Sequence, residues 1–373
     1  MTKKHPIACV VGARPNYMKM SPIIRAFQER NIASLLIHTG QHYDPEMNDR
    51  LFADLALPRP HINLEVGSAT HAVQTAEIMR KFEPVLDAQL PSAVLVVGDV
   101  NSTIACSLVA VKKHIPVIHV EAGLRSYDRN MPEEINRVLT DQIADLLYIT
   151  ERTAQSNLAK EGIDGNRIHF VGNVMIDSLF AARPNAVAPA ETLRLSGVAP
   201  DFIESAVGYG VVTLHRPSNV DDPETLRQLL ITLSMVAERL PLVFSAHPRT
   251  RKNIEKFGLV FLLSSRIRLL APQGYLEMLG LMSGAAVVLT DSGGMQEETT
   301  ALSVPCLTLR ENTERPITVD QGTNTLVGRN RGAILENVDQ IIATGGKRGR
   351  VPELWDGHAA ERIASHLKNW LDR

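Results

Sequence analysis

The sequence predicts an α/β fold of two Rossmann-like domains that face each other across a central cleft. In the first half, short apolar runs that suit buried strands alternate with helix-like segments, which is typical of a parallel sheet with helices on both faces. The alternation restarts after an Ala- and Pro-rich stretch at residues 182–200, which we interpret as the inter-domain connection. "AAVVLTDSGG" (285–294) also echoes "AVLVVGDVNST" (93–103), since both are apolar runs that end at aspartate before small or capping residues. The length of 373 residues suits two domains.

The first domain is predicted over residues 1–173. It opens with "IACVVG" (7–12), a continuous apolar run that breaks at glycine. A helix follows, with Ser21-Pro22 as N-cap and first residue, although a turn from Tyr17 could already be helical. Further strands are predicted at 34–39, 93–99, 116–123 and 146–150, and further helices after Pro45 and from about Thr70, Ser102 and Pro132.

The second domain is predicted over residues 174–356. Strands are expected at 209–215, 241–247 and 285–290, and Asp222-Pro223 opens a helix with leucines at helical spacing. The last segment, 357–373, is an amphipathic helix with Ile363, Leu367, Trp370 and Leu371 on one side. We expect this helix to pack back onto the first domain.

Composition excludes several classes of protein. A net charge of −2 argues against a nucleic-acid surface, which needs a basic stripe. The three cysteines (Cys9, Cys106, Cys306) form no CxxC pair and no zinc-type cluster, so we expect buried thiols in a reducing compartment and no metal. No apolar run approaches a membrane span or a signal-peptide core, so a soluble cytoplasmic protein with no membrane partner is expected.

Acidic side chains lie at strand ends of the first domain. Asp99 ends one strand, Glu121 ends the next, and Glu133 opens the helix of "MPEEINR". Such acids would repel one another unless cations neutralise them. They lie at the carboxyl edge of the predicted sheet, which is where open α/β sheets bind ligands. The available cations are Arg14, Lys19, Arg125 and Arg137. For Glu133 and Arg137, four residues apart on a helix, an exposed ion pair without function is the simpler interpretation.

"TDSGGMQEE" (290–298) is the best candidate anion site. Ser292 can cap the following helix, Gly293 and Gly294 let a ligand approach the backbone, and the free N–H groups attract phosphate. A capped helix with no ligand is the alternative. Arg315 in "ENTERP" follows the next strand and could close over the same phosphate.

Two histidines end strands of the second domain. His215 and His247 are each followed closely by an arginine, so both could face the cleft, although a lone histidine is more often structural. No Walker A motif is present and no GxGxxG follows a strand, so a tightly bound nicotinamide cofactor is not supported.

Taken in order, these segments resemble the non-hydrolysing UDP-N-acetylglucosamine 2-epimerases. The matching motifs are "GARPNYMKM", "TGQHYDPEM", "VVGDVNST", "HVEAGLRS", "PEEINR", "VGNVMID", "TLHRPSNVDD", "LTDSGGMQEE" and "LRENTERP". The resemblance implies a GT-B-like architecture, a homodimer, a UDP-sugar substrate and no added redox cofactor.

The resemblance also implies roles for individual residues. Catalytic or near-catalytic positions would be taken by Arg14, Lys19, Asp99, Glu121, Glu133, Arg137 and His215. UDP-binding positions would be taken by His247, Ser292, Gly293, Gly294, Glu298 and Arg315, with Glu298 at the ribose.

The sequence departs from the commonest family pattern at two places. Gln41-His42-Tyr43-Asp44 differs in the region that helps bind an activating UDP-sugar in regulated members, which leaves allosteric activation in doubt. "RPSNVDD" after His215 resembles epimerases of other UDP-HexNAc derivatives such as diacetamido uronic acids, whose carboxylate would need an extra cation, Arg125 or Arg129. A hydrolysing epimerase, a glycosyltransferase and a non-enzymatic UDP-sugar sensor are the remaining alternatives.

Overall fold

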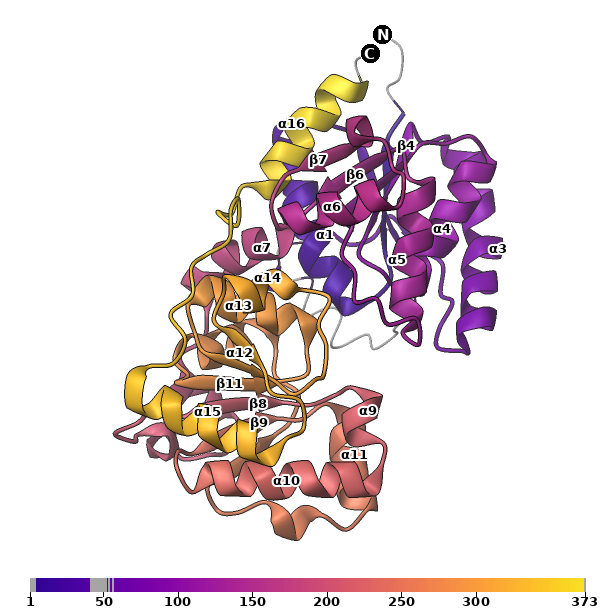
Figure 1. Cartoon of the computed structure of the whole chain (residues 1–373). Coiled ribbons are helices and arrows are strands. Elements are labelled where there is room, and N and C mark those ends of the chain that lie inside the picture. The colour runs from indigo at the N-terminus through magenta and orange to yellow at the C-terminus, as the bar shows by residue number, and fades with distance from the viewer. Residues whose placement is uncertain (1–4, 41–51, 53, 56, 372–373) are drawn as a thin grey trace. The chain divides into compact units, whose positions relative to one another are not determined.

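The computed structural model describes residues 5–40, 52, 54, 55 and 57–371, and the chain forms two compact units (Figure 1). The first unit comprises Met1–Ala181 and Glu353–Arg373, and the second comprises Ala182–Pro352. The boundary predicted between residues 173 and 174 lies at the start of α7 (Val174–Ala182), whereas the units divide near the end of that helix. The predicted helix after Pro45 and the segment 41–44 fall on residues outside the described ranges.

The first unit contains a seven-stranded sheet in the order β3-β2-β1-β4-β5-β6-β7, with parallel pairings throughout. Its strands are β1 (Ile7–Val11), β2 (Ser34–His38), β3 (Ile62–Asn63), β4 (Ala93–Val97), β5 (Val117–Ala122), β6 (Leu146–Ile149) and β7 (Ile168–Phe170). The order reverses between β1 and β4, which is the topological switch point where ligands of such sheets bind.

Helices cover this sheet, and those of the first unit are α1 (Arg14–Glu29), α3 (His71–Gln89), α4 (Asn101–Lys112), α5 (Pro132–Ile143), α6 (Arg152–Lys160), α7 and α16 (Ala359–Leu371). α3, α4 and α5 lie side by side (Figure 1). Phe82 and Leu86 of α3 and Cys106 of α4 are fully buried and pack with Val94 and Val96 of β4 in one apolar core. As predicted, Cys106 is a buried thiol, and Cys9 and Cys306 are buried as well.

The first helix begins earlier than predicted. α1 starts at Arg14 and contains Pro22, so Ser21-Pro22 is not its start. Asn16 stabilises the true start, because its Oδ1 accepts hydrogen bonds from Gly12 N (3.0 Å) and Ala13 N (2.9 Å). Proline inside a helix lacks the N–H that would bond the carbonyl four residues earlier. Here Ser178 of α7 donates its hydroxyl hydrogen bond to that carbonyl, on Met18.

We expect Ser178→Ala to lower the free energy of unfolding by about 1–2 kcal/mol, because it leaves the Met18 carbonyl without its donor. The loss should be smaller in a Pro22→Ala background, where residue 22 regains an N–H that can bond Met18. Urea unfolding of the wild type, both single variants and the double variant measures this coupling. An equal loss in both backgrounds would contradict it.

The second unit repeats the arrangement with a six-stranded sheet in the order β10-β9-β8-β11-β12-β13. Its strands are β8 (Gly210–Thr213), β9 (Leu242–Ser245), β10 (Ile267–Leu270), β11 (Val287–Thr290), β12 (Cys306–Thr308) and β13 (Asn324–Leu326), and all pairings are parallel. Two parallel sheets with this strand order confirm the predicted α/β class with two Rossmann-like halves.

The helices of the second unit are α8 (Pro189–Leu195), α9 (Pro217–Val220), α10 (Pro223–Ala237), α11 (Pro248–Lys256), α12 (Tyr275–Ser283), α13 (Gly293–Leu302), α14 (Pro316–Asp320) and α15 (Arg331–Thr344). The Asp222 side chain caps α10 by accepting a hydrogen bond from Thr225 N, as the Asp-Pro signal predicts. The segment 182–200, interpreted as the inter-domain connection and its surroundings, begins this unit and contains α8, whose Leu193 is fully buried in an apolar core of the unit.

The chain returns to the first unit at its C-terminal end. There α16 packs against α1, and Trp355 donates its Nε1–H to Thr150 O at 3.1 Å. The Asp177 carboxylate of α7 accepts hydrogen bonds from Ala359 N (3.1 Å) and Ala360 N (2.7 Å) at the start of α16. Within the described part of the chain, no helix is long and apolar enough to cross a lipid bilayer.

Candidate functional site

The carboxyl edge of the first sheet brings three acids and two cations together. Glu121 is the last residue but one of β5, and its Oε2 lies 2.6 Å from the Nζ atom of Lys19 on α1. Both side chains are almost completely buried, with exposed fractions of 2% and 5%. A buried ion pair of this kind is expensive to desolvate, so its presence at a ligand-binding edge indicates a functional role.

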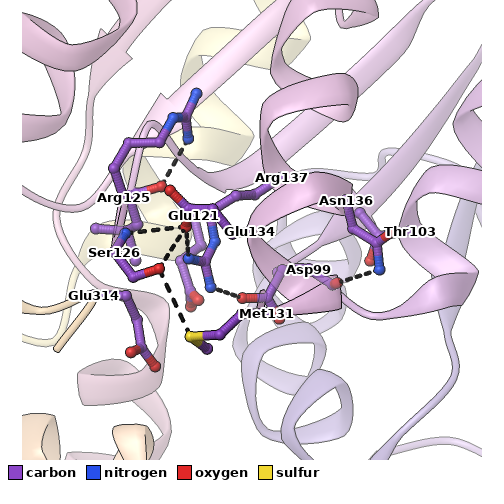
Figure 2. Close-up of polar contacts among 12 residues, drawn as sticks. Asp99, Thr103, Glu121, Arg125, Ser126, Met131, Glu134, Asn136, Arg137 and Glu314 are labelled. Atoms are coloured by element: carbon purple, nitrogen blue, oxygen red, sulfur yellow. Dashed lines mark hydrogen bonds and ion pairs between the residues drawn. The ribbon is translucent and has the colours of Figure 1, made fainter. Parts of the chain in front are cut away.

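Arg137 of α5 forms the second part of this cluster. Its Nη2 pairs with Asp99 Oδ2 and its Nη1 pairs with Glu134 Oε2, so the guanidinium bridges two carboxylates (Figure 2). Asn136, the preceding residue, donates from Nδ2 to the backbone oxygen of Asp99 at 2.9 Å. The structure therefore brings together Asp99 and Arg137, two of the candidate residues from the sequence.

The helical partner of Arg137 differs from the prediction. Arg137 pairs with Glu134, whereas the sequence pattern suggested an ion pair between Arg137 and Glu133. Glu134 is buried and also accepts hydrogen bonds from Ser126 N (3.0 Å), Ser126 Oγ (2.9 Å) and Tyr127 N (2.8 Å), which orders the loop before α5 (Figure 2). Glu133 is half-buried at the first turn of α5.

The backbone around these acids is unusual. Glu121 has φ +70°, a left-handed value that is rare for a non-glycine residue, and the register of β5 against β6 shifts between Val120 and Ala122. Gly98, before Asp99, has φ +67°, and a Cβ there would lie 3.1 Å from Lys19 Nζ. Strained positions of this kind concentrate at active sites.

The remaining candidate cations of the first unit differ in burial. Arg14 is the first residue of α1 and is half-buried, whereas Arg129 is exposed. Arg125 is buried and pairs with Asp141 at 2.7 Å and with both oxygens of Glu161. Arg125 is therefore committed to structural ion pairs.

In the second unit, His215 follows β8 and contacts a residue that the sequence analysis did not single out. Its Nδ1 lies 2.9 Å from Oδ1 of Asp291, which follows β11. Asp291 is completely buried and also accepts hydrogen bonds from His215 N (3.1 Å), Arg216 N (3.0 Å) and Asn219 Nδ2 (3.0 Å). Burial alone would raise the pKa of Asp291, but His215 and these hydrogen bonds outweigh it and lower the pKa.

The position of Asp291 at a strand end could have been inferred from the sequence. Asp291 ends an apolar run just as Asp99 does, and the likeness of those two runs was the basis for predicting two similar halves. Asp291 fixes the orientation of the His215 ring, and the His215 side chain remains 40% exposed.

His247 lies beside His215, with ring centroids 6.2 Å apart. It is the N-cap of α11, where its Nδ1 accepts a hydrogen bond from Arg249 N at 3.2 Å. The structure thus brings the two strand-end histidines together, and His247 is exposed.

The predicted anion site begins α13. Ser292 is its N-cap residue, but the Ser292 side chain makes no capping hydrogen bond, contrary to the prediction. Gly293 and Gly294 form the first turn, and a Cβ at Gly293 would lie 2.8 Å from Arg315 Nη1. Arg315 therefore does approach this helix start, and the first N–H groups of α13 are not capped by Ser292.

Arg315 is held by acidic side chains. Its Nε lies 2.9 Å from Glu297 Oε2 and its Nη1 lies 2.7 Å from Glu314 Oε1. Glu314 also pairs with Arg310 at 2.8 Å and lies 3.6 Å from Arg216. Three arginines therefore gather around one buried carboxylate next to the glycines of α13.

Glu298 of α13 is buried, and its Oε1 has no hydrogen-bond partner among the described residues. The buried Tyr275 hydroxyl faces this carboxyl group. Burial raises the pKa of Glu298 to about 7, against an opposing effect of Tyr275. An unsatisfied buried acceptor of this kind suits a ligand that brings hydroxyl groups.

We expect Glu298→Gln to stabilise the unliganded protein at pH 8 by about 2–3 kcal/mol. Because the folded-state pKa is raised to about 7 from 4.5, the folded protein holds this proton more tightly, and stability falls as the pH rises between these values. Glutamine removes that loss. Urea unfolding at pH 8 and pH 4 checks it, since the gain should disappear at pH 4; equal stability of variant and wild type at pH 8 would contradict it.

The described residues contain no group of three or more His, Cys, Asp or Glu side chains placed to hold a metal ion.

The chain is similar to known proteins over most of its length. A family model described as UDP-N-acetylglucosamine 2-epimerase matches residues 25–368. The chain is 44% identical to UDP-N-acetylglucosamine 2-epimerase of Methanocaldococcus jannaschii over 97% of this chain and 98% of the relative. It is 38% identical to UDP-2,3-diacetamido-2,3-dideoxy-D-glucuronate 2-epimerase of Pseudomonas aeruginosa, over 97% and 99% of the two chains. The crystal structure of the Methanocaldococcus jannaschii UDP-GlcNAc 2-epimerase with UDP-GlcNAc and UDP matches with a TM-score of 0.85 and 41% identity, covering 98% and 99% of the chains.

Proposed function

Because this chain belongs to the UDP-N-acetylglucosamine 2-epimerase family, we propose that it interconverts UDP-N-acetylglucosamine and UDP-N-acetylmannosamine without hydrolysis. The reaction is a reversible isomerisation at C2 of the sugar. The observation that carries this proposal is the pair of acid–cation contacts at one edge of the first sheet, the buried Glu121 with Lys19 and the partly buried Asp99 with Arg137.

The substrate chemistry explains why acids and cations are needed together. The C2 proton of a UDP-sugar is not acidic, since no carbonyl lies beside it. If the C1–O bond breaks first, its electron pair leaves with UDP and C1 gains oxocarbenium character, which makes the C2 proton acidic. A carboxylate then removes this proton and a glycal forms. UDP adds back at C1 while a proton returns to C2 from the opposite face.

Inversion therefore needs a proton acceptor and a proton donor on the two faces of the ring. Asp99, Glu121 and Glu133 are the carboxyl groups that we assign to these transfers. Lys19 and Arg137 hold two of the carboxylates in place through the contacts described above, and Arg14 and His215 supply positive charge or hydrogen bonds to the departing diphosphate.

UDP binding is assigned to the second unit. The N–H groups of Gly293 and Gly294 and the nearby Arg315 suit the diphosphate, and His247 lies at a neighbouring strand end. Glu298, whose Oε1 lacks a partner among the described side chains, suits the ribose hydroxyls, which would donate to it. The Ser292 N–H already donates to Thr290 Oγ1 at 3.0 Å and its side chain does not cap the helix, so the Ser292 hydroxyl group is the part of this residue that we assign to the diphosphate.

Two alternatives lie within the family. A hydrolysing epimerase would use the same residues but release UDP and N-acetylmannosamine. A diacetamido uronic acid substrate, as the name of the Pseudomonas relative states for that protein, would need a cation for its carboxylate. Of the two candidate cations, Arg125 is engaged by Asp141 and Glu161, whereas Arg129 is exposed.

The test is proton NMR of the purified protein with UDP-N-acetylglucosamine in deuterated water. Deuterium at C2 together with a UDP-N-acetylmannosamine signal supports the proposal. Free N-acetylmannosamine with stoichiometric UDP identifies the hydrolysing alternative. If no exchange occurs, the same assay is repeated with UDP-diacetamido-glucuronate, and deuterium at C2 of that sugar identifies it as the substrate. Sedimentation analysis separately tests the homodimer that the family resemblance implies.

A further inference from the structure

His119 is fully buried in β5, two residues before Glu121, and the mechanism proposed above does not use it. Its ring joins two other elements. Nδ1 lies 2.6 Å from Asp141 Oδ1 on α5, and Nε2 lies 2.8 Å from the carbonyl oxygen of Gly98, which follows β4. The ring therefore connects the helix that carries Arg137 to the turn that precedes Asp99.

The partners of His119 determine where its protons lie. A carbonyl oxygen only accepts hydrogen bonds, so Nε2 must carry a proton and donate it to Gly98. The other oxygen of Asp141 receives Gly123 N–H at 3.0 Å and faces Arg125 Nη2 at 2.7 Å. The Asp141 carboxyl group therefore lies between His119, Gly123 and Arg125 and fixes the ring on its Nδ1 side.

His119 lies at one end of a row of contacting polar side chains. The order is His119, Asp141, Arg125 and Glu161. Each member of this row holds its neighbour, so the position of the buried ring is fixed by side chains of α5 and of the loops beside it.

The peptide that His119 holds is the one that joins Gly98 to Asp99. Gly98 N donates to Val120 O at 3.1 Å, and Gly98 O receives the His119 Nε2–H, so both polar groups of Gly98 are bound by β5. Gly98 has φ +67°, a conformation of a tight turn, and the direction of the next side chain depends on this turn.

We propose that His119 is a positioning residue for Asp99, acting through the Gly98 carbonyl group. The inference rests on the proposed function, because it assigns His119 to the placement of a carboxylate that transfers a proton to or from C2. A misplacement of the order of 1 Å in such a group costs about 100-fold in rate.

Two amide variants separate the two hydrogen bonds of the ring. His119→Gln puts its amide nitrogen near the former Nε2 and keeps a donor for Gly98, whereas His119→Asn puts it near the former Nδ1 and keeps a donor for Asp141. Both remove the imidazole ring. We expect kcat for C2 epimerisation to fall about 100-fold in the Asn variant and to stay within about tenfold of wild type in the Gln variant. KM and UDP affinity should be unchanged in both.

The matched control is His169→Gln, a histidine of β7 in the same sheet that contacts Tyr148 and His366, and its kcat should equal wild type. Equal kcat in the Gln and Asn variants of His119, or a higher kcat in Asn, would overturn the proposal. So would a wild-type ¹⁵N NMR spectrum without a proton on Nε2 of His119.

Failure of the proposed function has a different signature. In that case wild type gives no C2 exchange with either UDP-sugar, and the backbone amide signal of Asp99 becomes the readout. A shift of that signal in the Asn variant but not in the Gln variant supports the positioning role, and equal shifts overturn it.

Discussion

Replacing Asp99 by asparagine is expected to lower kcat about 1000-fold, the rate that a positioned general acid or base contributes. Asparagine keeps the size of the side chain and an oxygen for Arg137, but it cannot accept the C2 proton. UDP affinity should be retained, because neither Asp99 nor its partner Arg137 is assigned to UDP binding. Initial rates by NMR and calorimetric titration with UDP measure the two quantities.

Glu121→Gln should behave in the same way, since Glu121 is the second carboxylate held by a cation. Asp87→Asn is the matched control, because Asp87 is an exposed carboxylate of the same unit that pairs with Lys113, and its kcat should not change. Full activity in both Asp99→Asn and Glu121→Gln would remove these acids from the mechanism.

Glu314→Gln is expected to lower the free energy of unfolding at pH 7 by about 3–5 kcal/mol, because it leaves buried arginines without their carboxylate. Burial tends to raise the pKa of Glu314, but Arg315, Arg310 and Arg216 outweigh it and lower the pKa well below its usual range. A lowered pKa stabilises the folded state above the unfolded pKa near 4.5, and this stabilisation is lost as the pH falls.

The effect of Glu314→Gln should therefore shrink as the pH is lowered below about 4. Urea unfolding at several pH values measures it. Glu311→Gln in the same "ENTERP" segment is the control, because Glu311 is exposed, and we expect a change within about 0.5 kcal/mol. A loss that is equally small in both variants would show that the arginine cluster does not depend on Glu314.

Elements with a local signal were predicted well from the sequence. Thr70 is the N-cap of α3 and Asp222 caps α10, since each cap depends only on residues within one turn. The start of α1 depends instead on a distant residue. Pro22 is tolerated inside that helix because Ser178, 160 residues away from Met18, supplies the missing donor. Local pattern cannot contain this information.

The candidate site shows the same division. Strand-end positions of Asp99, Glu121 and His215 follow from the alternation of strands and helices. The choice between Glu133 and Glu134 does not, because adjacent residues of a helix point in different directions and only the packing of α5 decides which one meets Arg137. Asp291, Glu314 and His119 were not singled out because their partners are other protein groups that come together only in the fold.

The return of the chain to its first unit sets an order of events during synthesis. Residues Ala182–Pro352 are continuous and can complete their sheet while the ribosome is still adding the last segment. The unit that carries Asp99 and Glu121 is complete only when Trp355 and α16 have been made and have docked. The acids therefore reach their final support last, and a chain that stops before α16 would contain a finished second unit beside an unfinished first one.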